Sequence, residues 1–221
     1  MKRRIGVRLN VSLAQRTRLE ALQEVFAGAC NLISPIVQET RCWNRVALHH
    51  MAYRLVRDAL PELGSQMACN AIYSVSQAAR QVYQAPASPF NLARLGTRPL
   101  PLLQFSSLAP VYFDRHTLSL RSGELSMFTL DGRMRFQLGL TDQQEARFNT
   151  NKLRQIVLTR NGDYFVLEFE FHATGAASSR NAPDRTDNVR PSPALDHVAV
   201  VPPPLSQDLV AKHPTKRHSM P

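Results

Sequence analysis

The chain has few cysteines, and their spacing excludes several kinds of site. Cys30, Cys42 and Cys69 are the only three in 221 residues. They form no C-x-x-C pair and no cysteine–histidine spacing of the zinc-finger type, so we expect no metal site. Widely spaced cysteines in an odd number are typical of a reducing compartment. We therefore expect a cytoplasmic protein, associated with the nucleoid if it binds DNA.

Long apolar runs and glycine-rich loops are also missing. No stretch approaches the roughly 18 apolar residues of a membrane span, and no apolar core region follows the basic N-terminus MKRRIGVRLNV. We therefore expect no membrane partner and no secretory signal. No glycine-rich phosphate loop and no Ser/His/Asp or Cys/His set with supporting local context occurs. The adjacent His49 and His50 would point about 100° apart on a helix, which makes chelation of one ion difficult. We expect no cofactor and no nucleophilic catalysis.

Lysine is scarce, and the positive charge is unevenly distributed. Only four of the 27 basic residues are lysines, and the net charge is +10. Residues 1–100 hold 13 basic residues against 5 acidic ones, whereas residues 101–171 hold 8 of each. Arginine forms forked hydrogen bonds with phosphates and base edges, so the basic N-terminal half indicates a nucleic-acid partner. A GC-rich genome that favours arginine codons is the alternative explanation.

The N-terminal half has the apolar spacing of a strand followed by helices. Residues 3–9 alternate basic and apolar side chains, which is typical of a half-buried strand. Asn10 or Ser12 could cap the long helix that follows, and Pro35 is expected to kink or end it. Phe26, Trp43 and Tyr83 are expected in the core rather than on the surface. Two further helices are predicted at about 43–60 and 65–84, with Ser65 as the cap of the second.

After a loop, the pattern changes to the period of two that strands have. Ser122-Gly123, Asp131-Gly132 and Asn161-Gly162 are the expected hairpin turns. Strands at this spacing predict a small barrel or curled sheet, which the strand at residues 3–9 is expected to join. The expected strands are QFSSLA, VYFD, TLSLR, ELSMFTL, RMRFQLGL, LRQIVLTR and DYFVLEFEF.

The last part of the sequence has no sustained pattern. Residues 172–221 contain eight of the fifteen prolines, and we expect a disordered tail there. The whole chain is thus predicted to be α+β, with a small antiparallel barrel, a helical bundle inserted after its first strand, and the tail. The expected parts are a first barrel strand (1–10), a helical insertion (11–85), a linker (86–101), the rest of the barrel (102–171) and the tail (172–221).

Three blocks of sequence carry a resemblance to a known family. They are RRIGVRLNVSLAQRTRLEALQEVFAGACNLI, then LHHMAYRLVRDALPELGSQMACNAIYSVSQAAR, then the strands FDRHTLSL, GELSMFTLDGRMRFQL and KLRQIVLTRNGDYFVLEFEF. Their order resembles the N-terminal half of TnpB proteins and small type V CRISPR effectors, over roughly residues 3–171. These are RNA-guided DNA nucleases encoded by insertion sequences and CRISPR loci. In that family a wedge-type barrel is interrupted after its first strand by a helical recognition lobe.

The resemblance implies a set of nucleic-acid-binding residues. In the family the helical pair reads the motif that flanks the target, and the first strand and first helix hold the guide RNA and the guide–target duplex. Asn and Gln can form two hydrogen bonds with adenine, and Arg with guanine. Helix capping and ordinary solvated polar residues are the alternatives. The expected site residues are Lys2, Arg3, Arg4, Arg8, Arg16, Arg18, Arg45, His49, Tyr53, Arg54, Arg57, Ser65, Gln66, Asn70, Tyr73 and Arg80.

The chain departs from the family after Phe171. There the family continues into an RNase H-like nuclease domain with convergent carboxylates, whereas this sequence enters the proline-rich tail. We therefore expect no enzyme activity, and a protein that binds structured guide-type RNA. Target-flanking duplex DNA and a separate nuclease or effector subunit are further expected partners. The alternatives are a truncated transposon-derived fragment without selected activity and a basic module that binds an acidic protein.

Overall fold

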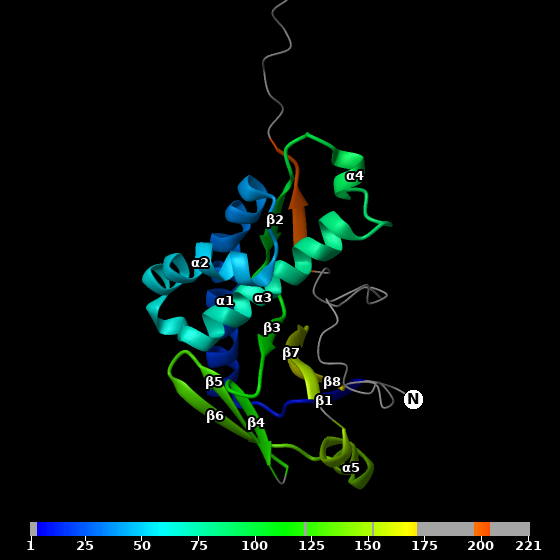
Figure 1. Cartoon of the computed structure of the whole chain (residues 1–221). Coiled ribbons are helices and arrows are strands. Elements are labelled where there is room, and N and C mark those ends of the chain that lie inside the picture. Colours follow the sequence, from blue (N-terminus) through cyan, green and yellow to red (C-terminus); the bar gives the residue numbers. More distant parts are fainter. Residues whose placement is uncertain (1–3, 122, 152, 172–196, 204–221) are drawn as a thin grey trace, which may run out of the picture.

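The computed structural model describes residues 4–121, 123–151, 153–171 and 197–203, and its elements are labelled in Figure 1. The helical elements are α1 (Leu13–Thr40), α2 (Arg45–Ala59), the 3-10 turn η1 (Pro61–Leu63), α3 (Ser65–Ala79), the π-helical turn η2 (Arg80–Gln84), α4 (Leu92–Leu95) and α5 (Asp142–Thr150). The strands are β1 (Arg4–Arg8), β2 (Leu102–Phe105), β3 (Val111–Phe113), β4 (Leu118–Arg121), β5 (Glu124–Thr129), β6 (Gly132–Gln137), β7 (Leu153–Asn161), β8 (Tyr164–Phe171) and β9 (Val198–Val201). The prediction of an α+β protein with antiparallel sheets is confirmed.

The largest sheet joins the first strand to the last part of the folded region. Its order is β1-β8-β7-β3, and all its pairings are antiparallel. In β1 the apolar Ile5 and Val7 are buried while the arginines between them are exposed, so the alternation predicted for this strand is confirmed. Helices α1 to α4 follow β1 in the chain and precede the other strands of this sheet. These helices thus lie in the chain between β1 and the other strands of its sheet.

The prediction of a barrel is wrong. Among the described residues the strands form three separate sheets: the four-stranded one, the pair β2-β9, and β4-β5-β6. A period of two predicts strands and their buried faces, but tertiary packing decides which strands become neighbours. Here β3 is the last strand in the order of its sheet, and besides its pairing with β7 it contacts α3. The β4-β5-β6 meander packs against the start of α1, and β2 packs against its later half.

Strand β9 lies in the segment for which a disordered tail was predicted. Val198–Val201 pair antiparallel with β2, with Val198 opposite Phe105 and Val201 opposite Leu102. The prediction is wrong for this short segment, while residues 172–196 and 204–221 lie outside the described residues. Four apolar residues in a row between polar and proline-rich sequence give no periodicity, so the pairing partner is what makes them a strand.

The long helix α1 packs against α2, α3 and β2. Ser12 and Gln15 form a capping box at its start, and α1 runs through Pro35 to Thr40, so the proline does not end it. Asn44 caps α2, with its Oδ1 accepting from the amides of Val46 and Ala47. Ser65 does not cap α3, because the N-cap is Gly64 and no side chain bonds there.

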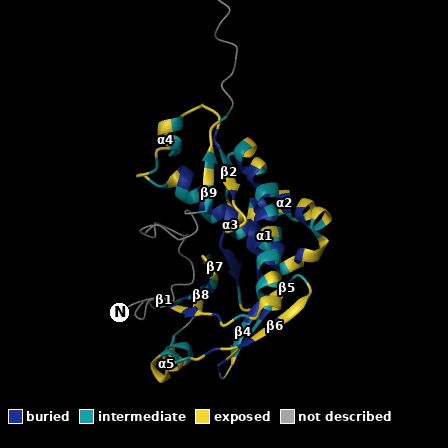
Figure 2. Ribbon diagram, turned by 180° about the vertical axis from the view of Figure 1, so that it is seen from behind, coloured by how far each residue is buried: buried dark blue, intermediate teal, exposed yellow. Residues whose placement is uncertain are grey.

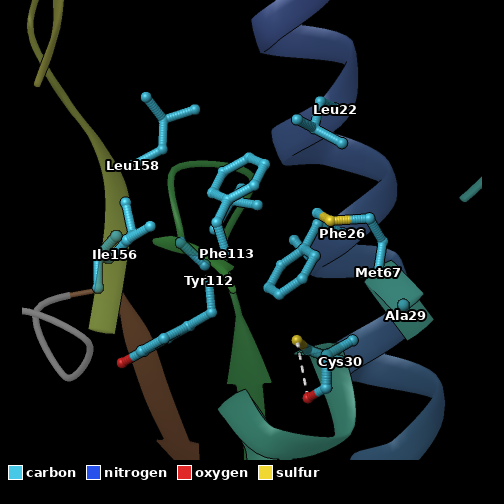
Figure 3. Close-up of a cluster of buried hydrophobic side chains, with 14 of the residues drawn as sticks. Leu22, Phe26, Ala29, Cys30, Met67, Tyr112, Phe113, Ile156 and Leu158 are labelled. Carbon is cyan, nitrogen blue, oxygen red and sulfur yellow. Dashed lines mark hydrogen bonds between the residues drawn. The ribbon is translucent and has the colours of Figure 1, made fainter. Parts of the chain in front are cut away.

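The core lies between α1, α3 and the strands, as the dark blue segments of Figure 2 show. In the close-up of Figure 3, Phe26 of α1 lies on one side of Phe113 of β3, and Ile156 and Leu158 of β7 lie on the other. Phe26 and Tyr83 are fully buried and Trp43 is half-buried against the core, as expected. The polar helix α5 was not predicted, because it has no apolar stripe. Within the described residues, no helix is long and apolar enough to cross a bilayer.

Candidate functional site

The side chains of α2 and α3 that face each other at the surface form one polar and aromatic patch. We call it the α2–α3 face, and it consists of Arg45, His49, Tyr53, Gln66, Cys69 and Tyr73. The α2 members are four residues apart and the α3 members three or four, so each set lies along one side of its helix. The rings of His49 and Tyr53 stack with centroids 4.8 Å apart at 29°. Across the helix pair, the Cys69 Sγ lies 3.9 Å from the Nδ1 of His49.

Tyr73 joins the α2–α3 face to the four-stranded sheet. Its hydroxyl donates to the Oε1 of Gln155 on β7 at 3.2 Å, and its ring meets the Tyr112 ring edge-on, 5.6 Å between centroids. The Arg45 guanidinium lies over the Tyr73 ring, with its Cζ 5.4 Å from the ring centre. Burial raises the pKa of the Tyr73 phenol, and nearby Arg154 and Arg45 oppose that rise. The hydroxyl therefore remains a hydrogen-bond donor at neutral pH.

Gln66 forms a second junction, with the loop after β3. Its Nε2 donates to the Oδ2 of Asp114 at 2.6 Å, and the other oxygen of Asp114 accepts from the amides of His116 and Thr117. This carboxylate holds the side-chain amide of Gln66 in place. The side-chain carbonyl oxygen (Oε1) of Gln66 makes no hydrogen bond with the described residues.

A basic sector extends from the α2–α3 face around the outer surface of α2. At about 100° per residue, Arg57, His50 and Arg54 follow Tyr53 within roughly a third of the helix circumference. Arg57 donates to the carbonyl of Pro61 at 3.2 Å. Arg54 is exposed and makes no hydrogen bond or ion pair with the described residues. The exposed apolar residues Met51 and Leu55 lie on the opposite flank. The cationic groups of α2 are thus gathered on the side that continues the face.

Not every predicted site residue belongs to this surface. Asn70 is buried, and its amide donates to the Oγ1 of Thr117 at 3.4 Å, so its hydrogen bonds are made inside the protein. Ser65 is exposed at the start of α3, and Arg80 is half-buried in η2, beyond the face. Asn70 was singled out because it is polar. Its burial follows from its position on α3 toward β4, which a single sequence does not reveal.

The basic residues predicted on β1 and the start of α1 are distributed rather than clustered. Lys2 and Arg3 lie outside the described residues. Arg4 pairs with Glu170 at 3.2 Å and Arg18 with Asp131 at 2.6 Å. The remaining two, Arg8 and Arg16, line a small hollow at the end of β1. Glu170 also pairs with Arg154 at 3.4 Å, so one carboxylate holds both Arg4 and Arg154.

The arginines of α2 differ from those of α1 and β7 in their partners. Ion pairs within 3.4 Å bind Arg4, Arg16, Arg18, Arg135, Arg154 and Arg160 to carboxylates. In the described part of the chain, no carboxylate lies within 4.0 Å of Arg41, Arg45, Arg54, Arg57, Arg94 or Arg98. Several of these bond to main-chain carbonyls instead, as Arg41 does to Gly96 at 2.8 Å. Single arginines of the strands and turns, Arg8, Arg115, Arg121 and Arg133, also lack a carboxylate partner there, but on α2 all three arginines do.

Sequence reasoning missed the members that complete the face. Cys69 lies between Gln66 and Tyr73 at helical spacing, and that spacing was the available signal. Burial raises the pKa of its thiol, while nearby Arg45 lowers it. Asp114 and Gln155 come from distant parts of the chain, and a single sequence gives no signal for them.

Comparison with protein-family models and with curated proteins gives no match. The described residues contain no group of three or more His, Cys, Asp and Glu side chains that could hold a metal ion.

Proposed function

We propose that this protein binds nucleic acid through the α2–α3 face and the basic sector of α2, with structured RNA as the main partner. The observation that carries the proposal is the difference in charge pairing. The three arginines of α2 have no carboxylate partner in the described residues, whereas those at the start of α1 and on β7 are paired. An unneutralised row of guanidinium groups favours a polyanion, because each phosphate contact releases condensed counterions.

The chemistry of the α2–α3 face suits bases as well as phosphates. Arg54 and Arg57 would contact phosphate oxygens, while the stacked pair of His49 and Tyr53 offers a flat surface to an unpaired base. The free carbonyl of Gln66 offers one acceptor to a base edge. Loops and bulges of structured RNA present such unstacked bases, whereas the edges in duplex RNA are hidden in a deep groove. This favours structured RNA, and it agrees with the resemblance to the recognition half of TnpB-like effectors.

Duplex DNA is the second candidate, because the resemblance implies that the helical pair reads a motif beside the target. An acidic protein is a different class of partner that the same charge could attract. The stacked aromatic pair favours nucleic acid over an acidic protein, since it adds a base-binding surface to the charge. The interpretation as a fragment without activity predicts no specific binding at all.

The test measures how binding affinity depends on salt concentration, and compares two variants that each lose two arginines. Fluorescence anisotropy would follow a hairpin RNA, a DNA duplex and polyglutamate, between about 50 and 200 mM salt. The variants are Arg54→Gln/Arg57→Gln, and the control Arg121→Gln/Arg135→Gln, which removes the same charge from the β4-β5-β6 sheet. We expect the first pair to weaken RNA binding about tenfold or more and the control to change it less than about threefold. Equal effects of the two pairs would remove the α2 surface from the site, and tighter binding of polyglutamate than of RNA would favour the protein partner.

A further inference from the structure

A small hollow opens where β1 ends and α1 begins. It has a volume of about 370 Å³ and is lined by Arg8, Leu9, Asn10, Val11, Arg16, Asp163 and Tyr164. That volume lies at the lower end of the roughly 300–1,000 Å³ typical of small-ligand sites. Its lining combines two arginines, an asparagine, an aspartate and a tyrosine with two apolar residues. The size and polarity of the site therefore suit a single anionic group together with part of the molecule that bears it.

The two arginines of the hollow are held in different ways. The Arg8 guanidinium lies over the Tyr164 ring, with Cζ 4.4 Å from the ring centre, and no carboxylate lies within 4.0 Å of it in the described part of the chain. Stacking orients the planar guanidinium while its edge N–H groups stay available to an acceptor. Arg8 is therefore a positioned cation without a counter-charge.

Arg16 has a counter-charge, but an exposed one. Its Nη1 lies 3.4 Å from the Oδ1 of Asp163, and its Nη2 also donates to the main-chain carbonyl of Asp163. The Asp163 side chain is 96% exposed, so this ion pair is screened by water and weak. An incoming phosphate could replace that carboxylate and bond to Arg16 in the forked geometry that guanidinium favours. The side-chain amide of Asn10 makes no hydrogen bond with the described residues and is free to donate as well.

We propose that this hollow is a phosphate site for nucleic acid, in which Arg8 and Arg16 hold one phosphate group and the Asp163 carboxylate occupies its place in the unbound protein. The inference rests on the proposed function, but it concerns a site separate from the α2–α3 face. The phosphate can be a terminal group or part of the backbone, because both present at least two non-bridging oxygens to a guanidinium. Asp163 then acts as a competitor that lowers the affinity for phosphate.

The neighbouring pair of Arg18 and Asp131 provides a matched control. It also joins an arginine of the first turns of α1 to an acidic residue at a hairpin, at 2.6 Å, but neither residue lines the hollow. Asp163→Asn and Asp131→Asn therefore remove the same charge from beside an arginine of α1. The same holds for Arg16→Gln and Arg18→Gln. A nonspecific effect of net charge would change both members of each comparison equally.

The experiment measures binding of a hairpin RNA of about 20 nucleotides, made with a 5′-phosphate and with a 5′-hydroxyl. We expect Arg8→Gln and Arg16→Gln each to weaken binding about three- to tenfold, and to reduce the slope of log K against log salt by about 0.7 to 0.9. Asp163→Asn is expected to tighten binding about threefold relative to Asp131→Asn. An effect confined to the 5′-phosphorylated RNA identifies a terminal phosphate, and an effect on both RNAs identifies a backbone phosphate.

The outcomes separate this site from the α2–α3 face. If Arg54→Gln/Arg57→Gln weakens binding while Arg8→Gln and Arg16→Gln behave like Arg18→Gln, the hollow is not a phosphate site, although the proposed function stands. If the wild-type protein shows no salt-sensitive binding, both fail together. Arg16→Lys, which keeps the charge, and thermal unfolding of each variant guard against loss of folding as the cause. Weaker binding by Asp163→Asn than by Asp131→Asn would also overturn the proposal.

Discussion

His49 and Tyr53 stack on each other one turn apart on α2, with ring centroids 4.8 Å apart at 29°. Cys69 of α3 lies 3.9 Å from His49, and at helical spacing the basic sector of α2 begins next to Tyr53. Two aligned rings next to arginines that lack carboxylate partners in the described residues combine the two elements of single-strand recognition, stacking and charge. This relationship makes the α2–α3 face testable by substitution of single side chains.

Tyr53 is expected to contribute through its ring rather than its hydroxyl. Tyr53→Leu keeps an apolar side chain but removes the stacking surface, so RNA binding should weaken by about 1–3 kcal/mol. Tyr53→Phe should bind within about twofold of the wild type, because the ring is retained. Anisotropy titrations at one salt concentration compare the two. A loss of affinity with Phe as large as with Leu would show that the hydroxyl matters instead.

Cys69 is expected to report occupancy of the α2–α3 face. The thiol lies within the face, whereas Cys42 lies in the turn between α1 and α2, and both are half-buried. Bound RNA should slow alkylation of Cys69 several-fold and leave that of Cys42 unchanged. Cys30 should react only after unfolding, because complete burial raises the pKa of its thiol to about 12 and excludes the reagent. Mass spectrometry of the alkylated peptides measures all three. Equal protection of Cys42 and Cys69 would place the RNA elsewhere.

Asn31 is expected to fix β2 to α1. Its side-chain amide donates to the carbonyl of Phe105 at 2.9 Å and accepts from the amide of Phe105 at 2.8 Å, which imitates a neighbouring strand. Asn31→Leu leaves both main-chain groups without that partner, and should lower the free energy of unfolding by about 2–4 kcal/mol. Gln38→Leu, which loses one bond to the carbonyl of Leu100, should lower it by about 1 kcal/mol. Urea denaturation measures both, and equal losses would contradict this role.

Asp131 is expected to make folding stability depend on acid pH. Hydrogen bonds from Arg18 and then Thr129 hold the pKa of its carboxyl below its ordinary value of 3.8. Since the folded pKa is the lower one, the stabilisation is fully present above pH 3.8 and is lost as the pH falls through the folded value. The stability difference between the wild type and Asp131→Asn should therefore shrink with falling pH in that window. Denaturation curves at several pH values test this, and a difference independent of pH would refute it.

The sequence predicted local structure better than it predicted neighbours. The alternation in residues 3–9, the capping box at Ser12 and the glycine turns at Gly132 and Gly162 depend on residues close in the chain, and each is found in the structure. Barrel closure depends on which strands meet, and β9 depends on β2, so neither could be inferred from periodicity. The same limit applies to Asn70, which is buried against Thr117 in the turn between β3 and β4, far along the chain.

The candidate site was predicted in part for the same reason. Arg45, His49 and Tyr53 share one side of α2 by helical spacing alone, and the structure brings them together with Gln66 and Tyr73. Whether an arginine has a carboxylate partner, in contrast, depends on tertiary contacts such as that of Arg18 with Asp131. The pairing of charges therefore had to come from the structure.

The salt dependence of RNA binding is the most direct measure of whether the α2–α3 face and its basic sector form the nucleic-acid interface. For the wild type, log K should fall linearly with log salt, and Arg54→Gln/Arg57→Gln should reduce the slope by about 1.4 to 1.8, with a matching loss of affinity. Arg121→Gln/Arg135→Gln should leave the slope nearly unchanged. A wild-type protein whose RNA binding does not respond to salt, or equal slopes for the two variants, would contradict the assignment of the α2–α3 face and its basic sector as the nucleic-acid interface.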